Sequence, residues 1–115
     1  QRRKNFKIYE KYLDKKNIFF PKELDSQYNT YHTFVIQTPN RDKLIKYLYK
    51  KGIQSAIHYP IPIHLQKAAK FLGYKEGSFP VTEHQAKTIL TLPIHQFLKN
   101  DEIKYISKTV NNFFK

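Results

Sequence analysis

The sequence contains no cysteine, no methionine and no tryptophan among its 115 residues. The absence of cysteine excludes disulfide bonds, thiolate zinc sites and thiol nucleophiles, and it makes a reducing cytoplasm the default expectation for localisation. Because methionine is missing at position 1 as well, we expect the chain to be a fragment or a processed segment of a longer translation product.

Long apolar runs are also absent. No stretch approaches the roughly 20 apolar residues that a helix needs to cross a bilayer. The first residues, QRRKN, lead into a polar helical pattern and not into the apolar region of a signal peptide. These features predict a soluble protein with no membrane partner.

Acidic residues are few, since nine Asp and Glu stand against 21 Lys and Arg and give a formal net charge of +12. A charge of this sign favours an anionic partner and keeps a nucleic-acid-binding module open as an alternative function. Only Arg2, Arg3 and Arg41 are arginines, and the lysines are spread along the whole chain. Since guanidinium groups make most bidentate contacts to bases, this distribution favours a lysine-rich solvated surface instead.

Apolar residues make up 40% of the chain and aromatic residues 16%, which is enough for one hydrophobic core in a single domain spanning 1–115. Alternating β-branched and aromatic residues predict strands over 31–38 and 53–58 and a short extended segment at 91–94. We therefore expect an α+β fold in which helices cover a small, mostly antiparallel sheet. Helical spacing of apolar residues predicts five helices, over 2–16, 41–50, 65–72 and 81–90 and from the expected cap residue Asn100 to near the C-terminus. In the last helix, Ile103, Ile106, Val110 and Phe113 lie on one face.

The helix after Pro39 is the best defined of these elements. Asn40 is its expected N-cap, and the run Lys50, Lys51 and Gly52 is expected to end it. Its apolar stripe contains Leu44, Ile45 and Leu48. We expect Leu48 to lie in the core with Leu44 and with Ile36 of the preceding strand.

The segment HYPIPIH, residues 58–64, combines two histidines and a tyrosine with two prolines. Proline fixes φ and lacks a backbone donor, so the segment must leave regular structure there. His58 and Tyr59 could contact a ligand from such a loop, or they could close a strand end by packing. His64 could likewise be a ligand contact or a helix-start residue, and a metal site would need a third ligand that the sequence does not supply.

Several segments together resemble the C-terminal domain of the DegT/DnrJ/EryC1/StrS family of sugar-nucleotide aminotransferases. The resemblance covers nearly the whole chain, and its motifs occur in the family's order. They are RDKLIKYLYKKGIQSAIHYPIPIHLQ, GYKEGSFPVTEHQAKTILTLPIH and NDEIKYISKTVNNF.

The resemblance implies a fold-type-I enzyme, homodimeric and dependent on pyridoxal phosphate, that transfers an amino group, usually from glutamate, to a nucleotide-linked keto-sugar. It implies that this chain is the small C-terminal domain, that a large domain absent here holds most of the cofactor, and that no catalytic residue lies in this chain. Substrate binding is implied for His58 and Tyr59 near the diphosphate and for His64 in the same loop. A few relatives use the same fold for dehydration.

Five other motif residues are expected to serve the structure. Glu83 should stabilise the first turn of a helix, and Arg41 with Asp42 should form a surface pair at a helix start. Phe79 should hold its turn in the core, and Gly77 should supply backbone freedom there.

Overall fold

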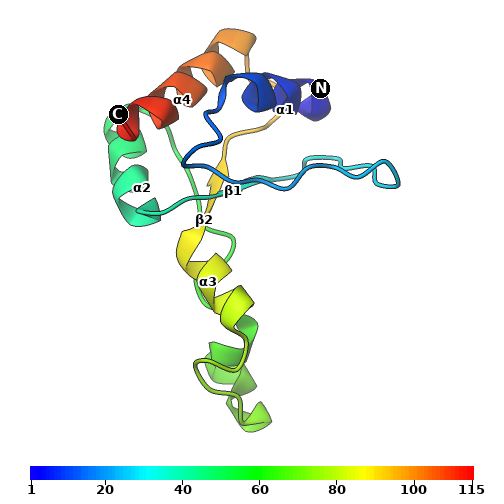
Figure 1. The fold of residues 1–115 in the computed structure, drawn as a ribbon, viewed down its shortest axis with the longest axis vertical. Helices are drawn as coiled ribbons and strands as arrows, with labels where there is room; N and C mark the ends of the chain where they lie inside the picture. The colour runs from blue at the N-terminus through cyan, green and yellow to red at the C-terminus, as the bar shows by residue number, and fades with distance from the viewer.

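Figure 1 shows the fold of residues 1–115, all of which are described by the structure, a computed structural model. Helices α1, α2 and α4 gather at one end of the molecule, beside the sheet, and α3 leads away from the other end of the sheet (Figure 1). This arrangement confirms the expected α+β fold. In chain order the elements are α1 (Arg2–Tyr12), β1 (Phe34–Gln37), α2 (Arg41–Lys50), the 3₁₀ helices η1 (Ile63–Leu65) and η2 (Lys67–Leu72), α3 (Pro80–Thr88), β2 (Ile89–Leu92) and α4 (Asn100–Phe113).

The sheet consists of β1 and β2, which pair antiparallel with Phe34 opposite Leu92 and Ile36 opposite Leu90. These four side chains are buried, while the alternate residues of each strand are only partly buried. The alternation follows from the two-residue period of a strand, which places one face on the core. The strand predicted over 31–38 is thus confirmed in its centre and is shorter at both ends.

The second strand does not lie where the sequence predicts it, at 53–58. That segment makes only an isolated bridge, between Ala56 and Thr91, because the chain turns into the proline loop immediately afterwards. The partner of β1 is instead Ile89–Leu92, so the helix predicted over 81–90 ends at Thr88. The expected helix over 65–72 is likewise replaced by two 3₁₀ helices, the second of which ends at Gly73 with φ 74°.

One hydrophobic core joins α1, α2, α4 and the sheet. Leu44 and Leu48 of α2 and Ile36 of β1 are each 0% exposed, which confirms the predicted stripe. The aromatic part of the core lies between α1 and β1. There Phe6 stacks on Tyr31 with ring centroids 4.0 Å apart, and both Phe20 and Phe6 meet Phe34 edge to face.

Helix α1 ends at Tyr12 and not near residue 16, as the sequence predicts. The next residue, Leu13, is extended, with φ −75° and ψ 129°. Asn111 of α4 donates from Nδ2 to the carbonyl of Tyr12 at 2.8 Å and accepts from the N–H of Asp14 at 2.9 Å. A contact between the two helices therefore stabilises the end of α1 at a point that local periodicity does not reveal.

The beginning of α2 confirms Asn40 as the N-cap residue, but it differs from the expectation in how Asn40 caps and in where Arg41 lies. Asn40 adopts a left-handed conformation, with φ 60° and ψ 26°, and its side chain makes no capping hydrogen bond. Arg41, predicted at the surface, is 9% exposed. Its Nη1 donates to the carbonyls of Ala86 at 3.1 Å and Ile89 at 3.0 Å, so it joins α2 to the end of α3. Only Asp42, bonded to Nε of Arg41 at 2.6 Å, lies at the surface as expected.

Helix α4 packs on α1 through a face that contains Ile103, Ile106 and Val110, all buried as predicted. The helix begins at Asn100, and its N-cap is Lys99. The carboxylate of Glu102, three residues after the cap, accepts from the N–H of Lys99 at 2.7 Å. The expected cap residue is thus the first residue of the helix.

Residues 57–88 form a separate extension, which we call the arm, made of the proline loop, η1, η2 and α3 (Figure 1). No side chain of the arm belongs to the hydrophobic core. The buried side chains within the arm are those of His64, Ala69, Glu83 and Ala86. The arm therefore contributes no side chain to the core, and hydrogen bonds such as those from Arg41 to Ala86 and between His58 and Thr91 attach it to the rest of the domain.

Candidate functional site

The proline loop leaves the sheet at Ala56, which exchanges two backbone hydrogen bonds with Thr91 of β2 at 2.8 and 3.2 Å. Two residues further on, Nδ1 of His58 lies 2.9 Å from the hydroxyl of the same threonine. The peptide bond between His58 and Tyr59 is cis. The sheet thus positions the imidazole directly, and the loop begins from a fixed point.

His58 and Tyr59 are neighbours in space as well as in sequence, with ring centroids 5.6 Å apart in an edge-to-face arrangement. Both are exposed, and 72% of Tyr59 is accessible. His58 lines a cavity of about 480 Å³, together with Val35 and Gln37 of β1 and with Gln85. Tyr59 does not line this cavity but lies next to His58, and an imidazole and a phenol in this arrangement can both donate to the oxygens of an anionic ligand.

His64 does not join this pair. Its side chain is buried, 8% exposed, and its Nε2 lies 2.9 Å from Oε1 of Glu83 in α3. The structure therefore brings together two of the three predicted site residues and places the third in a buried contact with α3. That His64 binds substrate stays a prediction.

Glu83 has the structural role that the sequence predicts, but through more contacts than the helix dipole. Its carboxylate accepts from the N–H groups of Gly77 at 2.9 Å and Phe79 at 3.2 Å, in addition to the contact with His64. The hydrogen bond from Gly77 is the largest cause of a lowered pKa for Glu83, and the bonds from His64 and Phe79 add to it against the opposing effect of burial. Gly77 adopts φ 91°, which is the backbone freedom expected of it.

The sequence predicts Phe79 in the core, and this prediction is wrong, because the residue is 41% exposed. Its ring packs edge to face on His64 at 4.8 Å and on Tyr74 at 4.9 Å. It therefore covers the contact between His64 and Glu83 from the solvent side.

The carboxyl group of Glu83 should titrate below its ordinary value of 4.5, and in a His64→Phe variant its pKa should rise only part of the way back. The reason is that the hydrogen bond from Gly77 remains. Because the pKa is lowered in the folded state, the stabilisation from the carboxylate is present above the ordinary value and is lost as the pH falls through the lowered one. A ¹³C NMR titration of the Glu83 carboxyl carbon measures both values. Full return to the ordinary pKa in the variant would contradict this order of causes.

Thr91 is a site residue that the sequence does not single out. It stands between Leu90 and Leu92, whose side chains are buried, so its own side chain faces away from the core. A polar residue in the middle of the short apolar run ILTL is the signal that could have identified it. Its hydroxyl is the direct support of His58.

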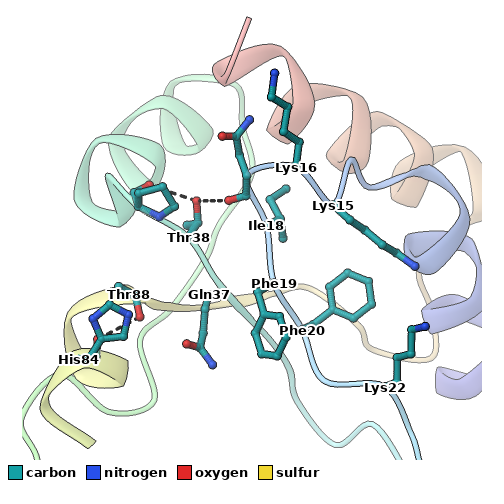
Figure 2. Close-up of a pocket in the computed structure, with 12 residues that line it drawn as sticks. Lys15, Lys16, Ile18, Phe19, Phe20, Lys22, Gln37, Thr38, His84 and Thr88 are labelled. Carbon is teal, nitrogen blue, oxygen red and sulfur yellow. Dashed lines mark hydrogen bonds between the residues drawn. The ribbon is translucent and has the colours of Figure 1, made fainter. Parts of the chain in front are cut away.

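A second cavity, of about 630 Å³, adjoins the first and shares Phe20 and Gln37 with it. Figure 2 shows its basic side chains, Lys15, Lys16, Lys22 and His84, and no carboxylate lines it. The amino group of Lys16 points away from those of Lys15 and Lys22, and His84 lies at the opposite side of the cavity (Figure 2). The basic groups therefore flank the cavity and do not converge on one anion.

All three arginines make contacts within the chain. Arg2 donates to the carbonyl of His32 at 3.0 Å, Arg3 pairs with Glu23 at 2.7 Å, and Arg41 is buried beneath α3. The arginines that base contacts would require are thus all engaged in contacts within the chain.

The structure contains no group of three or more histidine, cysteine, aspartate or glutamate side chains that could hold a metal ion. None of its helices combines the length and the apolar character that crossing a bilayer requires.

The fold is that of a domain found in sugar aminotransferases. A crystal structure of DesV from S. venezuelae, in complex with a ketimine intermediate, superimposes with a TM-score of 0.87 at 28% identity, covering 97% of this chain and 31% of that one. A sugar aminotransferase from Streptococcus pneumoniae gives a TM-score of 0.86 at 25% identity, covering 96% of this chain and 29% of that one. The class that the fold defines is therefore a domain of a fold-type-I aminotransferase.

The sequence comparison gives the family. The chain belongs to the DegT/DnrJ/EryC1/StrS aminotransferase family, whose model matches residues 1–111. It is 36% identical to a pleiotropic regulatory protein of Geobacillus stearothermophilus, covering 100% of this chain and 32% of that protein. It is 34% identical to a dTDP-3-amino-3,6-dideoxy-alpha-D-galactopyranose transaminase of Aneurinibacillus thermoaerophilus, covering 98% of this chain and 31% of that enzyme. The chain thus spans about a third of the length of these relatives, and the resemblance predicted from its motifs is confirmed.

Proposed function

We propose that this chain is the C-terminal small domain of an aminotransferase that moves an amino group, from glutamate, to a nucleotide-linked keto-sugar. The observation that carries the proposal is the exposed pair His58 and Tyr59, of which His58 lines a cavity, in a chain of this family. Relatives named as transaminases of dTDP- and UDP-linked sugars support the class of substrate. In this proposal the two side chains bind the diphosphate.

The proline loop suits such a contact for an energetic reason. Pro60 and Pro62 restrict the backbone, and Thr91 holds His58 in place before any ligand arrives. A loop that is ordered in advance loses less conformational entropy when it binds. Donation to phosphate oxygens needs only a neutral imidazole and a phenol, so no charged histidine is required.

The cofactor implied by the family is pyridoxal phosphate, which forms a covalent bond to an enclosed lysine and supplies an electron sink for amino transfer. The lysines of this chain do not fit that requirement, because every one of them is exposed. We therefore propose that the cofactor is held mainly by the rest of the intact enzyme, and we assign no residue of this chain to it.

The 115-residue chain alone should form no stable lysine adduct with stoichiometric pyridoxal phosphate and should not transaminate. The physical reason is that an exposed lysine offers no pocket to shield the adduct from water. Mass spectrometry after borohydride reduction measures the adduct, with the intact enzyme as the positive control. A single modified lysine at full occupancy in the chain alone would refute the assignment of the cofactor to the missing part.

The exposed apolar surface of the arm supports the proposal that the intact enzyme is a homodimer. Nine of the 16 exposed large apolar side chains lie between Tyr59 and Val81, a density that a solvent-exposed surface rarely carries. We propose that in the intact enzyme this surface packs against the rest of the protein, including a second subunit. We also propose a cytoplasmic enzyme, in keeping with the absence of cysteine.

In the intact enzyme, His58→Ala or Tyr59→Phe should weaken sugar-nucleotide binding more than it slows the half-reaction with glutamate. The nucleotide takes no part in that half-reaction, so a residue that contacts only the diphosphate cannot change its rate. Rapid-mixing kinetics of the two half-reactions, with the dissociation constant of the sugar nucleotide, test the proposal. Phe97→Ala, a change at a side chain that is 79% exposed outside the arm, is the control and should alter neither. Equal slowing of both half-reactions by the loop variants would show that the loop is only a structural support.

A further inference from the structure

The carboxylate of Glu83 connects three segments of the arm. Both of its oxygens accept from the N–H of Gly77 at 2.9 Å, and Oε1 accepts from the N–H of Phe79 at 3.2 Å. The same Oε1 lies 2.9 Å from Nε2 of His64. Since an ionised carboxylate can only accept, Nε2 of His64 must carry the hydrogen of this bond. The turn before α3, α3 itself and η1 therefore meet at one charged group.

His64 and Glu83 are the two polar side chains buried in the arm, each 8% exposed, and the other buried residues there are alanines. A hydrogen bond to a charged group shielded from water is stronger than a neutral one. This bond therefore joins η1 and α3 through two buried polar side chains.

The proline loop is held at both of its ends. At the first end, Ala56 and His58 both bond to Thr91 of β2. At the second end, His64 follows the last proline by two residues and bonds to Glu83. Between these ends the prolines supply no N–H donors, and Gln66 donates to the carbonyl of Ile61 at 3.2 Å. The orientation of the loop thus depends on its two fixed ends.

We propose that His64 and Glu83 are positioning residues for sugar-nucleotide binding. Their hydrogen bond fixes the second end of the loop, so that His58 and Tyr59 are held where the diphosphate arrives. This inference rests on the proposed function. His64 acts here through the backbone of the loop, because its Nε2 is bonded to Glu83.

Because no arm side chain belongs to the hydrophobic core, a positioning role can be distinguished by experiment from a general stabilising role. Breaking the bond between His64 and Glu83 should loosen the loop and leave the core intact. A residue needed only for general stability would instead loosen every element together.

The test uses the intact enzyme with four substitutions. His64→Phe keeps a ring but removes the N–H donor, and Glu83→Gln removes the charge. His64→Gln restores an N–H donor and serves as the rescue variant. His84→Phe makes the same chemical change at an exposed histidine of α3 and serves as the matched control. The probes are dTDP and UDP, titrated by calorimetry, together with amide hydrogen exchange and thermal unfolding.

The wild type should bind dTDP or UDP, and the dissociation constant for that nucleotide should be roughly tenfold higher in His64→Phe and in Glu83→Gln. A rise of this size corresponds to the loss of one such hydrogen bond. Amide exchange should become faster in residues 58–64 and remain unchanged in α2 and α4. His64→Gln should recover most of the affinity, and His84→Phe should behave as the wild type does.

Either of two results would overturn the positioning role and leave the proposed function standing. They are unchanged exchange in residues 58–64, and unchanged affinity in both variants while His58→Ala weakens binding. Faster exchange throughout α2 and α4 with a fall in melting temperature would also overturn it, because it would reveal a general stabilising role. If His58→Ala leaves the affinity unchanged too, or if neither nucleotide binds to the wild type, the proposed function fails and the positioning role fails with it.

Discussion

Replacing Leu48 by alanine is expected to lower the free energy of unfolding of this domain by roughly 2 to 5 kcal/mol, the usual cost of emptying a fully buried leucine site. Leu48 is 0% exposed and belongs to the core cluster together with Leu44 and Ile36, so little rearrangement can fill the space. Small domains are stable by only about 5 to 15 kcal/mol, and the change would remove a large part of that margin.

The matched control for this change is Tyr49→Ala, one residue further along α2, where the side chain is 79% exposed. Its effect should stay within about 0.5 kcal/mol, as for most surface substitutions. Urea unfolding of the three proteins, followed by circular dichroism, measures the difference. Equal stability of Leu48→Ala and the wild type would mean that α2 presents a different face to the core.

Replacing Arg41 by methionine is expected to cost roughly 2 to 4 kcal/mol, because two backbone carbonyls lose their donor and each unsatisfied buried acceptor costs about 1 to 3 kcal/mol. The carbonyls are those of Ala86 and Ile89, at the junction of α3 and β2. Methionine retains much of the length of the side chain, so the loss is one of hydrogen bonds more than of packing.

Two further variants separate the contacts of Arg41. In Arg41→Lys a single ammonium group replaces the planar fork, so only part of the stability should return. Asp42→Asn removes the charge that pairs with Nε of Arg41. Because the side chain of Asp42 is 79% exposed, this change should alter the stability by less than about 1 kcal/mol. The same unfolding measurements apply. If Asp42→Asn proved as costly as Arg41→Met, the surface pair and not the buried carbonyls would explain the role of Arg41.

The parts of the fold that could be predicted from the sequence are those determined by local periodicity. Leu44 and Leu48 repeat at helical spacing, and Phe34 and Ile36 repeat at strand spacing, and each set is buried on one face. Gly52, with φ 75°, ends its helix as a glycine can. In these cases the residues nearby in the sequence are enough to predict which side chains are buried and where the helix ends.

The parts that could not be predicted depend on contacts between distant residues. Helix α1 ends where Asn111 reaches its last carbonyl, 99 positions away in sequence. Arg41 is buried because its partners are carbonyls 45 and 48 positions away. Residues 53–58 and β2 both have strand-like composition, so composition alone does not predict which of them pairs with β1. In the structure the partner is β2.

The candidate site shows the same division. The prolines predict that His58 and Tyr59 lie on a loop, and the structure places both of them exposed there. The contact of His64 with Glu83 spans 19 positions, and the support of His58 by Thr91 spans 33, so neither could be read from a local motif. The sequence identifies the loop, and the tertiary contacts decide what each histidine does in it.

The independence of the arm from the hydrophobic core has a consequence for how such domains can diverge. A substitution in residues 57–88 changes few contacts on which folding of the core depends, since no arm side chain belongs to it. Variants with altered loops can therefore persist without loss of the folded protein, even where the same change in α2 or α4 would be eliminated. Under the proposed function, exchange of residues in the arm would alter the loop that presents His58 and Tyr59, on a core that is kept nearly constant.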